Sequence, residues 1–268
     1  MPSVRSAPCA IGVSLKMYFG YRETLDWCAQ VGALASRNRG VAAGAIDLFV
    51  IPSFPVLSAV LSLLKGRPLS VGAQDLFWED RGAFTGEVSG SLLAELGCRY
   101  VEVGHAERRR LFGETDQIVA LKVEAAFRNA LCPIICVGEA DRDDVATAAR
   151  RCMGQVNAAL DRVSGRDDPI IIAYEPVWAI GASEPAPPEH IRSVCAHLRT
   201  ALDAIRPATS SRVIYGGTAG PGMLAQLDGA VDGLFLGRRV HDTSALEAIL
   251  DEISATTTPS SLKEAHDN

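Results

Sequence analysis

Short apolar runs alternate along the chain with longer stretches in which apolar residues recur at helical spacing. Each run is rich in Val and Ile and too short for a buried helix, so the pattern predicts strands. The runs lack polar alternation, which is typical of parallel strands that are covered on both faces. The eight predicted strands are CAIGVSL (9–15), IDLFVIP (46–52), LSVGAQ (69–74), YVEVGH (100–105), CPIICVGE (132–139), PIIIAYEP (169–176), SRVIYGG (211–217) and DGLFLGR (232–238).

Amphipathic segments such as 115–131 and 188–205 lie between these runs and predict helices. Eight strands that alternate with helices favour an α/β protein built as a single closed (β/α)8 barrel, with a doubly wound open sheet as the alternative. The Pro-rich piece 181–190 is short enough to be a loop, so no linker divides the chain. We expect the barrel domain to span 1–255 and the polar tail 256–268 to fray.

Composition narrows the class of protein. The 268 residues include 26 basic and 32 acidic side chains, and the net charge of -6 gives no reason to expect nucleic acid as a partner. No apolar run approaches the roughly 20 residues that span a bilayer, and the first residues lack the features of a secretory signal, so no membrane partner is expected. Seven scattered cysteines without a C-x-x-C pair predict free thiols, no structural zinc and a reducing, cytoplasmic location.

Polar residues follow several of the predicted strands. The first strand ends at Lys16, the fourth at His105 and the sixth at Glu175, while glycine turns follow the seventh and eighth strands. Because chemistry in such barrels takes place where the strands end, a cation, an imidazole and a carboxylate are expected to meet at one mouth. This arrangement predicts an acid/base site beside an anion-binding site.

Several strings carry a family resemblance. VEVGHAERRRLFGETD (101–116), ICVGE (135–139), AYEPVWAIG (173–181) and IYGGT (214–218) closely resemble signatures of the triosephosphate isomerase family, and 71–89 resembles its third barrel loop. The resemblance runs from about Gly12 to Gly237. It implies a (β/α)8 TIM barrel that shifts a carbonyl through an enediolate. The implied reaction converts dihydroxyacetone phosphate to glyceraldehyde 3-phosphate, in glycolysis and gluconeogenesis.

The resemblance also implies roles known for that family. Glu175 matches the base that moves a proton between neighbouring carbons. His105 matches the group that donates a hydrogen bond to the substrate oxygens, with its pKa lowered by the helix that follows. Lys16 matches the cation that neutralises developing oxyanion charge. Side chains supply both proton transfer and charge stabilisation, so no metal and no organic cofactor are expected.

Further positions match by the same resemblance. Glu107 matches an acid that pairs with Lys16, Cys136 a packing thiol near the base, and 176–187 the lid that closes on the substrate. Thr85 is expected to reach the active site of a second copy, which implies a homodimer. The substrate and phosphate contacts are expected from Ser14, Gly181, Gly216, Gly217, Thr218, Gly237 and Arg238.

The chain departs from the family pattern around this acid/base set. Ser14-Leu15 stands where the family usually has Asn-Trp, and Ala106 stands where it has a serine. The tip of the lid, residues 182–185, also differs in sequence from the family, and Gly237-Arg238 replaces Gly-Gly. Arg238 either adds charge at the phosphate or points outward. A wider pocket at Ser14 suits a four-carbon ketose phosphate, so conversion of L-erythrulose 1-phosphate to D-erythrulose 4-phosphate in tetritol catabolism is the alternative reaction. A non-catalytic sugar-phosphate-binding barrel is the alternative from another class of protein.

Overall fold

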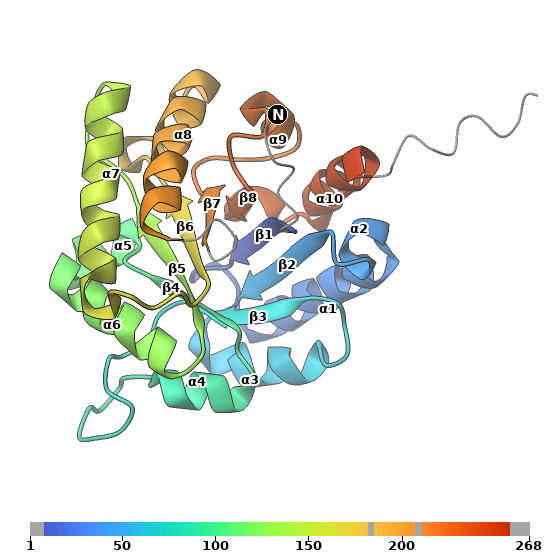
Figure 1. The fold of residues 1–268 in the computed structure, drawn as a ribbon. Coiled ribbons are helices and arrows are strands. Elements are labelled where there is room, and N and C mark those ends of the chain that lie inside the picture. Colours follow the sequence, from blue (N-terminus) through green and yellow to red (C-terminus); the bar gives the residue numbers. More distant parts are fainter. Residues whose placement is uncertain (1–7, 182–184, 207–210, 258–268) are drawn as a thin grey trace, which may run out of the picture.

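The eight strands follow one another around a closed parallel barrel in the order of the chain, and β8 pairs with β1 (Figure 1). The computed structural model describes residues 8–181, 185–206 and 211–257. The strands are β1 (Cys9–Ser14), β2 (Ile46–Ile51), β3 (Ser70–Ala73), β4 (Tyr100–Val103), β5 (Cys132–Val137), β6 (Ile170–Tyr174), β7 (Ser211–Tyr215) and β8 (Gly233–Leu236). Each lies within one of the eight apolar runs, so the predicted single (β/α)8 TIM barrel is confirmed and the open sheet is wrong.

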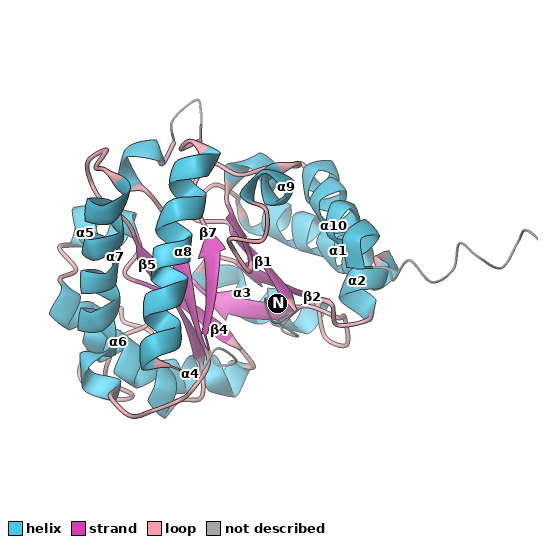
Figure 2. Cartoon of the chain, turned by 45° about the horizontal axis from the view of Figure 1, so that its top comes forward, coloured by secondary structure: helices cyan, strands magenta, loops and turns pink. Residues whose placement is uncertain are grey.

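Helices surround the strands on the outside of the barrel (Figure 2). They are α1 (Tyr21–Arg37), α2 (Arg39–Ala42), α3 (Phe54–Leu63), α4 (Gly90–Leu96), α5 (Ala106–Phe112), α6 (Asp116–Arg128), α7 (Val145–Leu160), α8 (Pro188–Ile205), α9 (Met223–Leu227) and α10 (Thr243–Thr257). Three 3₁₀ turns, η1 (Asp161–Val163), η2 (Val177–Ala179) and η3 (Arg238–Val240), complete the described elements. The polar tail predicted for 256–268 lies outside the described residues from 258 onward. No described helix is both long and apolar enough to cross a membrane.

Alternate residues of each strand point to opposite sides of the barrel wall, and this alternation determines which side chains reach the interior. In β4, Val101 and Val103 pack outward in the larger apolar cluster under the helices, whereas Tyr100 packs in the cluster that fills the barrel. Glu102 shares the inward side with Tyr100 and is 3% exposed. The wall therefore buries a carboxylate at the level just below the mouth.

A buried cluster of charged side chains joins α5 and α6 to the residues that follow β3. The Nζ atom of Lys122, on α6, lies 2.6 and 2.7 Å from the two carboxylate oxygens of Asp75 and 2.6 Å from Oε1 of Glu114. Arg108, on α5, pairs with the same two carboxylates. Lys122 is 3% exposed, so each charge depends on its partners for the solvation that water would otherwise supply.

Replacing Lys122 tests this dependence. Lys122→Met leaves two buried carboxylates with Arg108 as their remaining cation in this cluster, and we expect it to lower the free energy of unfolding by about 3–5 kcal/mol. Urea unfolding, followed by circular dichroism at one protein concentration, measures the change.

The matched control is Arg37→Met, because Arg37 pairs with Glu247 on the surface, where both side chains are more than two-fifths exposed. This change should cost less than about 1 kcal/mol. Equal losses in the two variants would contradict the view that burial makes the Lys122 cluster costly to break.

Candidate functional site

A cavity of about 360 Å³ opens at the ends of the strands that the sequence singled out. Its wall includes all three predicted acid/base residues, Lys16, His105 and Glu175, which the structure thus brings together. The other lining residues are Ser14, Ile180, Gly181, Gly216, Gly217, Thr218, Ala219, Phe235, Leu236, Gly237, Arg238 and Arg239. A cation, an imidazole and a carboxylate therefore face one volume that is large enough for a small phosphorylated sugar.

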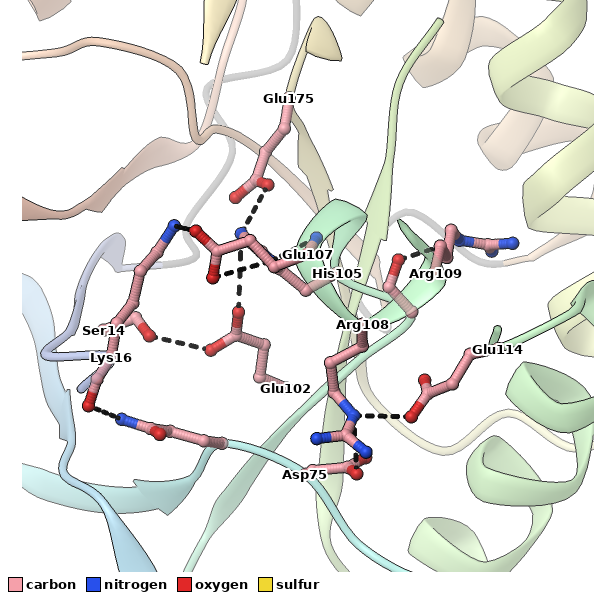
Figure 3. A network of polar contacts seen from close by, with 12 residues as sticks. Ser14, Lys16, Asp75, Glu102, His105, Glu107, Arg108, Arg109, Glu114 and Glu175 are labelled. Carbon is pink, nitrogen blue, oxygen red and sulfur yellow. Dashed lines mark hydrogen bonds and ion pairs between the residues drawn. The ribbon is translucent and has the colours of Figure 1, made fainter. Parts of the chain in front are cut away.

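Lys16 occupies the turn that follows β1 in an uncommon backbone conformation. Its φ of 49° lies in the left-handed region, which residues with a side chain seldom adopt. The amide of Gln74 donates to the Lys16 carbonyl over 2.9 Å and holds this turn. The Lys16 ammonium donates to Glu107 Oε1, also over 2.9 Å, and is thereby directed over the mouth of the barrel (Figure 3).

His105 lies between two buried carboxylates (Figure 3). Its Nε2 atom is 3.1 Å from Oε2 of Glu175 and 3.9 Å from Oε1 of Glu102. On the other side of the ring, Nδ1 accepts the backbone N–H of Glu107 over 3.1 Å. An Nδ1 atom that accepts this bond leaves the ring proton on Nε2, the nitrogen that faces the carboxylates. The imidazole is thus oriented as a hydrogen-bond donor.

Burial and charge act in opposite directions on His105. Burial lowers the pKa of the imidazole, but the Glu175 and Glu102 carboxylates outweigh burial and raise that pKa to about 9. In the ligand-free site the two carboxylates thus oppose the lowering of this pKa that was expected from the following helix. The helix N–H does contact Nδ1, as expected, and this bond requires a neutral ring, whereas the two carboxylates close to Nε2 favour a charged one. If the Glu175 side chain turned toward a substrate, His105 would lose the carboxylate that does most to raise its pKa.

Glu102 is the participant that the sequence reasoning missed. Its Oε2 atom accepts the Ser14 hydroxyl over 2.9 Å, and Ser14 and Glu102 are 4% and 3% exposed. Burial raises the pKa of Glu102, as does the Glu175 charge, whereas His105 and Lys16 oppose the rise. The available signal was an acidic residue at an inward position of a strand that is otherwise apolar.

The predicted phosphate-binding residues form part of the cavity wall. Gly181, Gly217, Thr218 and Gly237 all line it, as does Arg238, which is exposed and lies over the Tyr18 ring at 5.4 Å.

Gly216 acts differently from its neighbours. Its N–H already donates to the Tyr174 carbonyl, and a Cβ atom there would lie 2.6 Å from Cγ of Glu175. Gly216 therefore makes room for the Glu175 carboxylate.

The beginning of the predicted lid is anchored to the barrel. The indole N–H of Trp178 donates to Oε1 of Glu139 over 2.8 Å, and the Tyr174 hydroxyl donates to the same oxygen over 3.1 Å. Glu139 is 1% exposed, so these bonds form in a dry environment. Residues 182–184, which carry most of the altered lid tip, lie outside the described residues.

Cys136 is buried beside the site. Burial raises the pKa of its thiol well above the usual value, so this side chain remains a thiol and packs as an apolar group. Within residues 8–181, 185–206 and 211–257, no group of three or more His, Cys, Asp or Glu side chains is arranged to hold a metal ion.

Comparison with known proteins identifies the family. The sequence model of the triosephosphate isomerase family matches residues 9–253. The chain belongs to this family. Among curated relatives, it is 51% identical to the L-erythrulose-1-phosphate isomerase of Pectobacterium atrosepticum over 249 residues, which cover 92% of this chain and 96% of the relative.

Two further relatives are a triosephosphate isomerase and a second L-erythrulose-1-phosphate isomerase. The chain is 42% identical to the triosephosphate isomerase of Moorella thermoacetica over 211 residues, which cover 76% of this chain and 85% of the relative. It is 39% identical to the L-erythrulose-1-phosphate isomerase of Mesorhizobium japonicum over 255 residues, covering 91% and 97%. Family and relatives agree on the class of enzyme: the chain is a sugar-phosphate isomerase that shifts a carbonyl. The non-catalytic alternative is therefore wrong.

The charge arrangement of this isomerase makes a prediction that requires no substrate. Glu175→Gln removes the largest favourable charge beside His105, so the pKa of the imidazole should fall below its value of about 9. A titration of the ring ¹⁵N shifts of ligand-free protein by NMR measures the change.

Asp80→Asn is the control, because Asp80 pairs with Arg128 on the surface. It should leave the His105 titration unchanged. An unaltered titration in Glu175→Gln would show that Glu175 does not govern the charge on the ring.

Proposed function

We propose that the chain isomerises a four-carbon ketose phosphate, converting L-erythrulose 1-phosphate to D-erythrulose 4-phosphate. Two observations support this substrate over the three-carbon one that the motifs alone favoured. The relative from P. atrosepticum, whose name states L-erythrulose 1-phosphate, is 51% identical across nearly the whole chain, against 42% for the M. thermoacetica triosephosphate isomerase. The cavity wall also carries the small, buried Ser14 at a position where the family usually has asparagine.

The proposed chemistry assigns one step to each residue of the trio. Glu175 removes the proton from the carbon that bears the hydroxyl next to the carbonyl, and the electron pair forms an enediolate. The same carboxylate returns the proton to the former carbonyl carbon, so the carbonyl moves by one position. His105 donates from Nε2 to the former carbonyl oxygen and takes up the proton that the neighbouring hydroxyl oxygen loses, so that the former carbonyl ends as a hydroxyl and the former hydroxyl as the carbonyl. The Lys16 ammonium offsets the charge on the enediolate oxygens. Glu175 and His105 are each 4% exposed, and the exclusion of water strengthens their electrostatic interactions with the substrate.

Substrate geometry separates the two candidate reactions. The four-carbon ketose phosphate carries a hydroxymethyl group where dihydroxyacetone phosphate carries a hydrogen, at the end of the reacting carbons away from the phosphate. The larger substrate therefore requires space at the end of the cavity away from the phosphate. The glycine turns after β6, β7 and β8, with Thr218, supply backbone N–H groups for the phosphate, and Arg238 lies at the rim where its charge attracts a dianion.

We also propose that the isomerase is a homodimer in the cytoplasm. The loop between β3 and α4 extends away from the barrel (Figure 1) and exposes Thr85. Beside it Phe84 is 42% exposed, and near the active site Met17 and Tyr18 are 92% and 50% exposed. Apolar side chains on a projecting loop and beside a site suit burial against a second copy.

The dimer prediction is checked by mass. Light scattering at micromolar concentration should give twice the chain mass, and Phe84→Asp together with Met17→Asp should shift the mass toward one chain by adding charge to the interface. A single-chain mass for the unchanged protein would contradict the dimer.

The role of Glu175 is tested by shortening and by neutralising its side chain. Glu175→Asp draws the carboxylate back by about 1 Å, which should lower kcat about a hundredfold, and Glu175→Gln should remove nearly all turnover. Steady-state rates with the four-carbon substrate, on variants whose circular dichroism matches that of the unchanged protein, check both. Substantial turnover by Glu175→Gln would show that a different base operates.

The substrate assignment is tested with a paired assay. The unchanged protein should have the higher kcat/KM for L-erythrulose 1-phosphate, and Ser14→Asn should shift the preference toward dihydroxyacetone phosphate by about tenfold to two-hundredfold, because the amide fills the space for the extra carbon. A preference of tenfold or more for dihydroxyacetone phosphate in the unchanged protein would reject the four-carbon substrate and favour the triose reaction.

A further inference from the structure

A buried pair of side chains at the base of the cavity has no assigned role in the proton transfer. Ser14, the inward residue at the end of β1, lines the cavity, whereas Glu102 lies behind it on β4 and is not part of the lining. The Ser14 hydroxyl donates to Oε2 of Glu102 over 2.9 Å (Figure 3). These strands are not neighbours in the barrel, so this bond crosses its interior.

A carboxylate in this place needs a reason, because an isolated buried charge is costly. Glu102 is 3% exposed, and the neighbouring inward residue of its strand, Tyr100, belongs to the apolar cluster that fills the barrel. Its polar contacts among the described residues are Ser14 at 2.9 Å and His105 Nε2 at 3.9 Å. Of these two, the Ser14 contact has the length of a hydrogen bond.

The direction of this bond determines what Ser14 offers to a ligand. A hydroxyl group has one hydrogen to donate and two lone pairs that accept. The carboxylate of Glu102 takes the hydrogen, so the lone pairs of Ser14 Oγ remain for the cavity. Ser14 then accepts from a substrate that presents a donor at this place, and it gains nothing from a substrate that presents a carbon-bound hydrogen.

We propose that Glu102 is a positioning residue that holds Ser14 as a hydrogen-bond acceptor for the terminal hydroxyl of the substrate. The inference rests on the proposed function and deepens it, since the terminal hydroxyl is the group by which the four-carbon ketose phosphate exceeds the three-carbon one. Without a donor in that place, the acceptor side of Ser14 is buried unpaired, and this cost disfavours the smaller substrate. Ser14 thus selects by polarity as well as by size.

The readout is the ratio of kcat/KM for L-erythrulose 1-phosphate to kcat/KM for dihydroxyacetone phosphate, with both conversions followed by ³¹P NMR. Both substrates react through the same enediolate, so a change in the charge or orientation of His105 affects both rates and cancels in the ratio. A variant that only weakens the fold also lowers both rates. The ratio therefore isolates recognition of the extra hydroxymethyl group.

Ser14→Ala, Glu102→Met and the double variant form a cycle. Each single change should lower the ratio about tenfold or more, because each removes the oriented acceptor. The double variant should match Ser14→Ala within about twofold, because Glu102 acts through Ser14. Glu102→Gln keeps a carbonyl oxygen that can accept the Ser14 hydroxyl, so it should restore most of the ratio that Glu102→Met loses.

A control variant neutralises a comparable carboxylate at the far end of the barrel. Asp47, on β2, accepts the Tyr100 hydroxyl at the amino-terminal end of the strands. Asp47→Asn should leave the ratio unchanged.

Three results would overturn the inference: a ratio that Glu102→Met does not alter, losses that multiply in the double variant, or a Glu102→Gln ratio as low as that of Glu102→Met. Failure of the proposed function gives a different result: the unchanged protein would convert the triose phosphate but not the four-carbon ketose phosphate. That result would remove the inference as well.

Discussion

The contact of one imidazole with two buried carboxylates is the interaction on which the site depends. Glu102 and Glu175 approach His105 Nε2 to 3.9 and 3.1 Å, and all three residues are less than 5% exposed. Two negative charges in a dry space repel each other, so the site is stable only with the donors that surround it. Lys16, which favours the charged form of Glu102, and the Ser14 hydroxyl are two of these donors.

The same arrangement prepares the isomerase for its substrate. In the ligand-free site Glu175 is engaged with His105, and this contact raises the pKa of the imidazole. In the proposed mechanism, a phosphorylated ketose brings a carbon acid to Glu175 and oxygens to His105, so each group exchanges its present partner for one on the substrate. Once Glu175 turns to the substrate, the neutral state of the ring, in which Nδ1 accepts the Glu107 N–H, is favoured. Neutral imidazole is the form that donates from Nε2 without drawing the proton back from Glu175.

The sequence was sufficient to predict the barrel because each strand is an apolar run with a clear end. It was also sufficient to predict that Lys16, His105 and Glu175 meet at one cavity, since each of them follows a strand and parallel strands bring their ends to one mouth. It was not sufficient for Glu102, whose partner Ser14 is 88 residues away in the chain. No local pattern encodes a bond across the barrel interior, and the rise in the pKa of His105 depends first on Glu175, which follows a different strand.

In the proposed function, specificity and chemistry therefore come from two successive levels of side chains. The acid/base residues follow the strands and lie at the mouth, where a substrate of any length in this class reaches them. Ser14 and Glu102 lie within the strands, one level deeper. Only every second residue of a strand points into the barrel, so few side chains fill that level, and the size and polarity of each limit those of its neighbours. A change of substrate at that level needs a matched pair, because a serine without its carboxylate has no fixed direction and a carboxylate without its serine is left buried with one fewer donor.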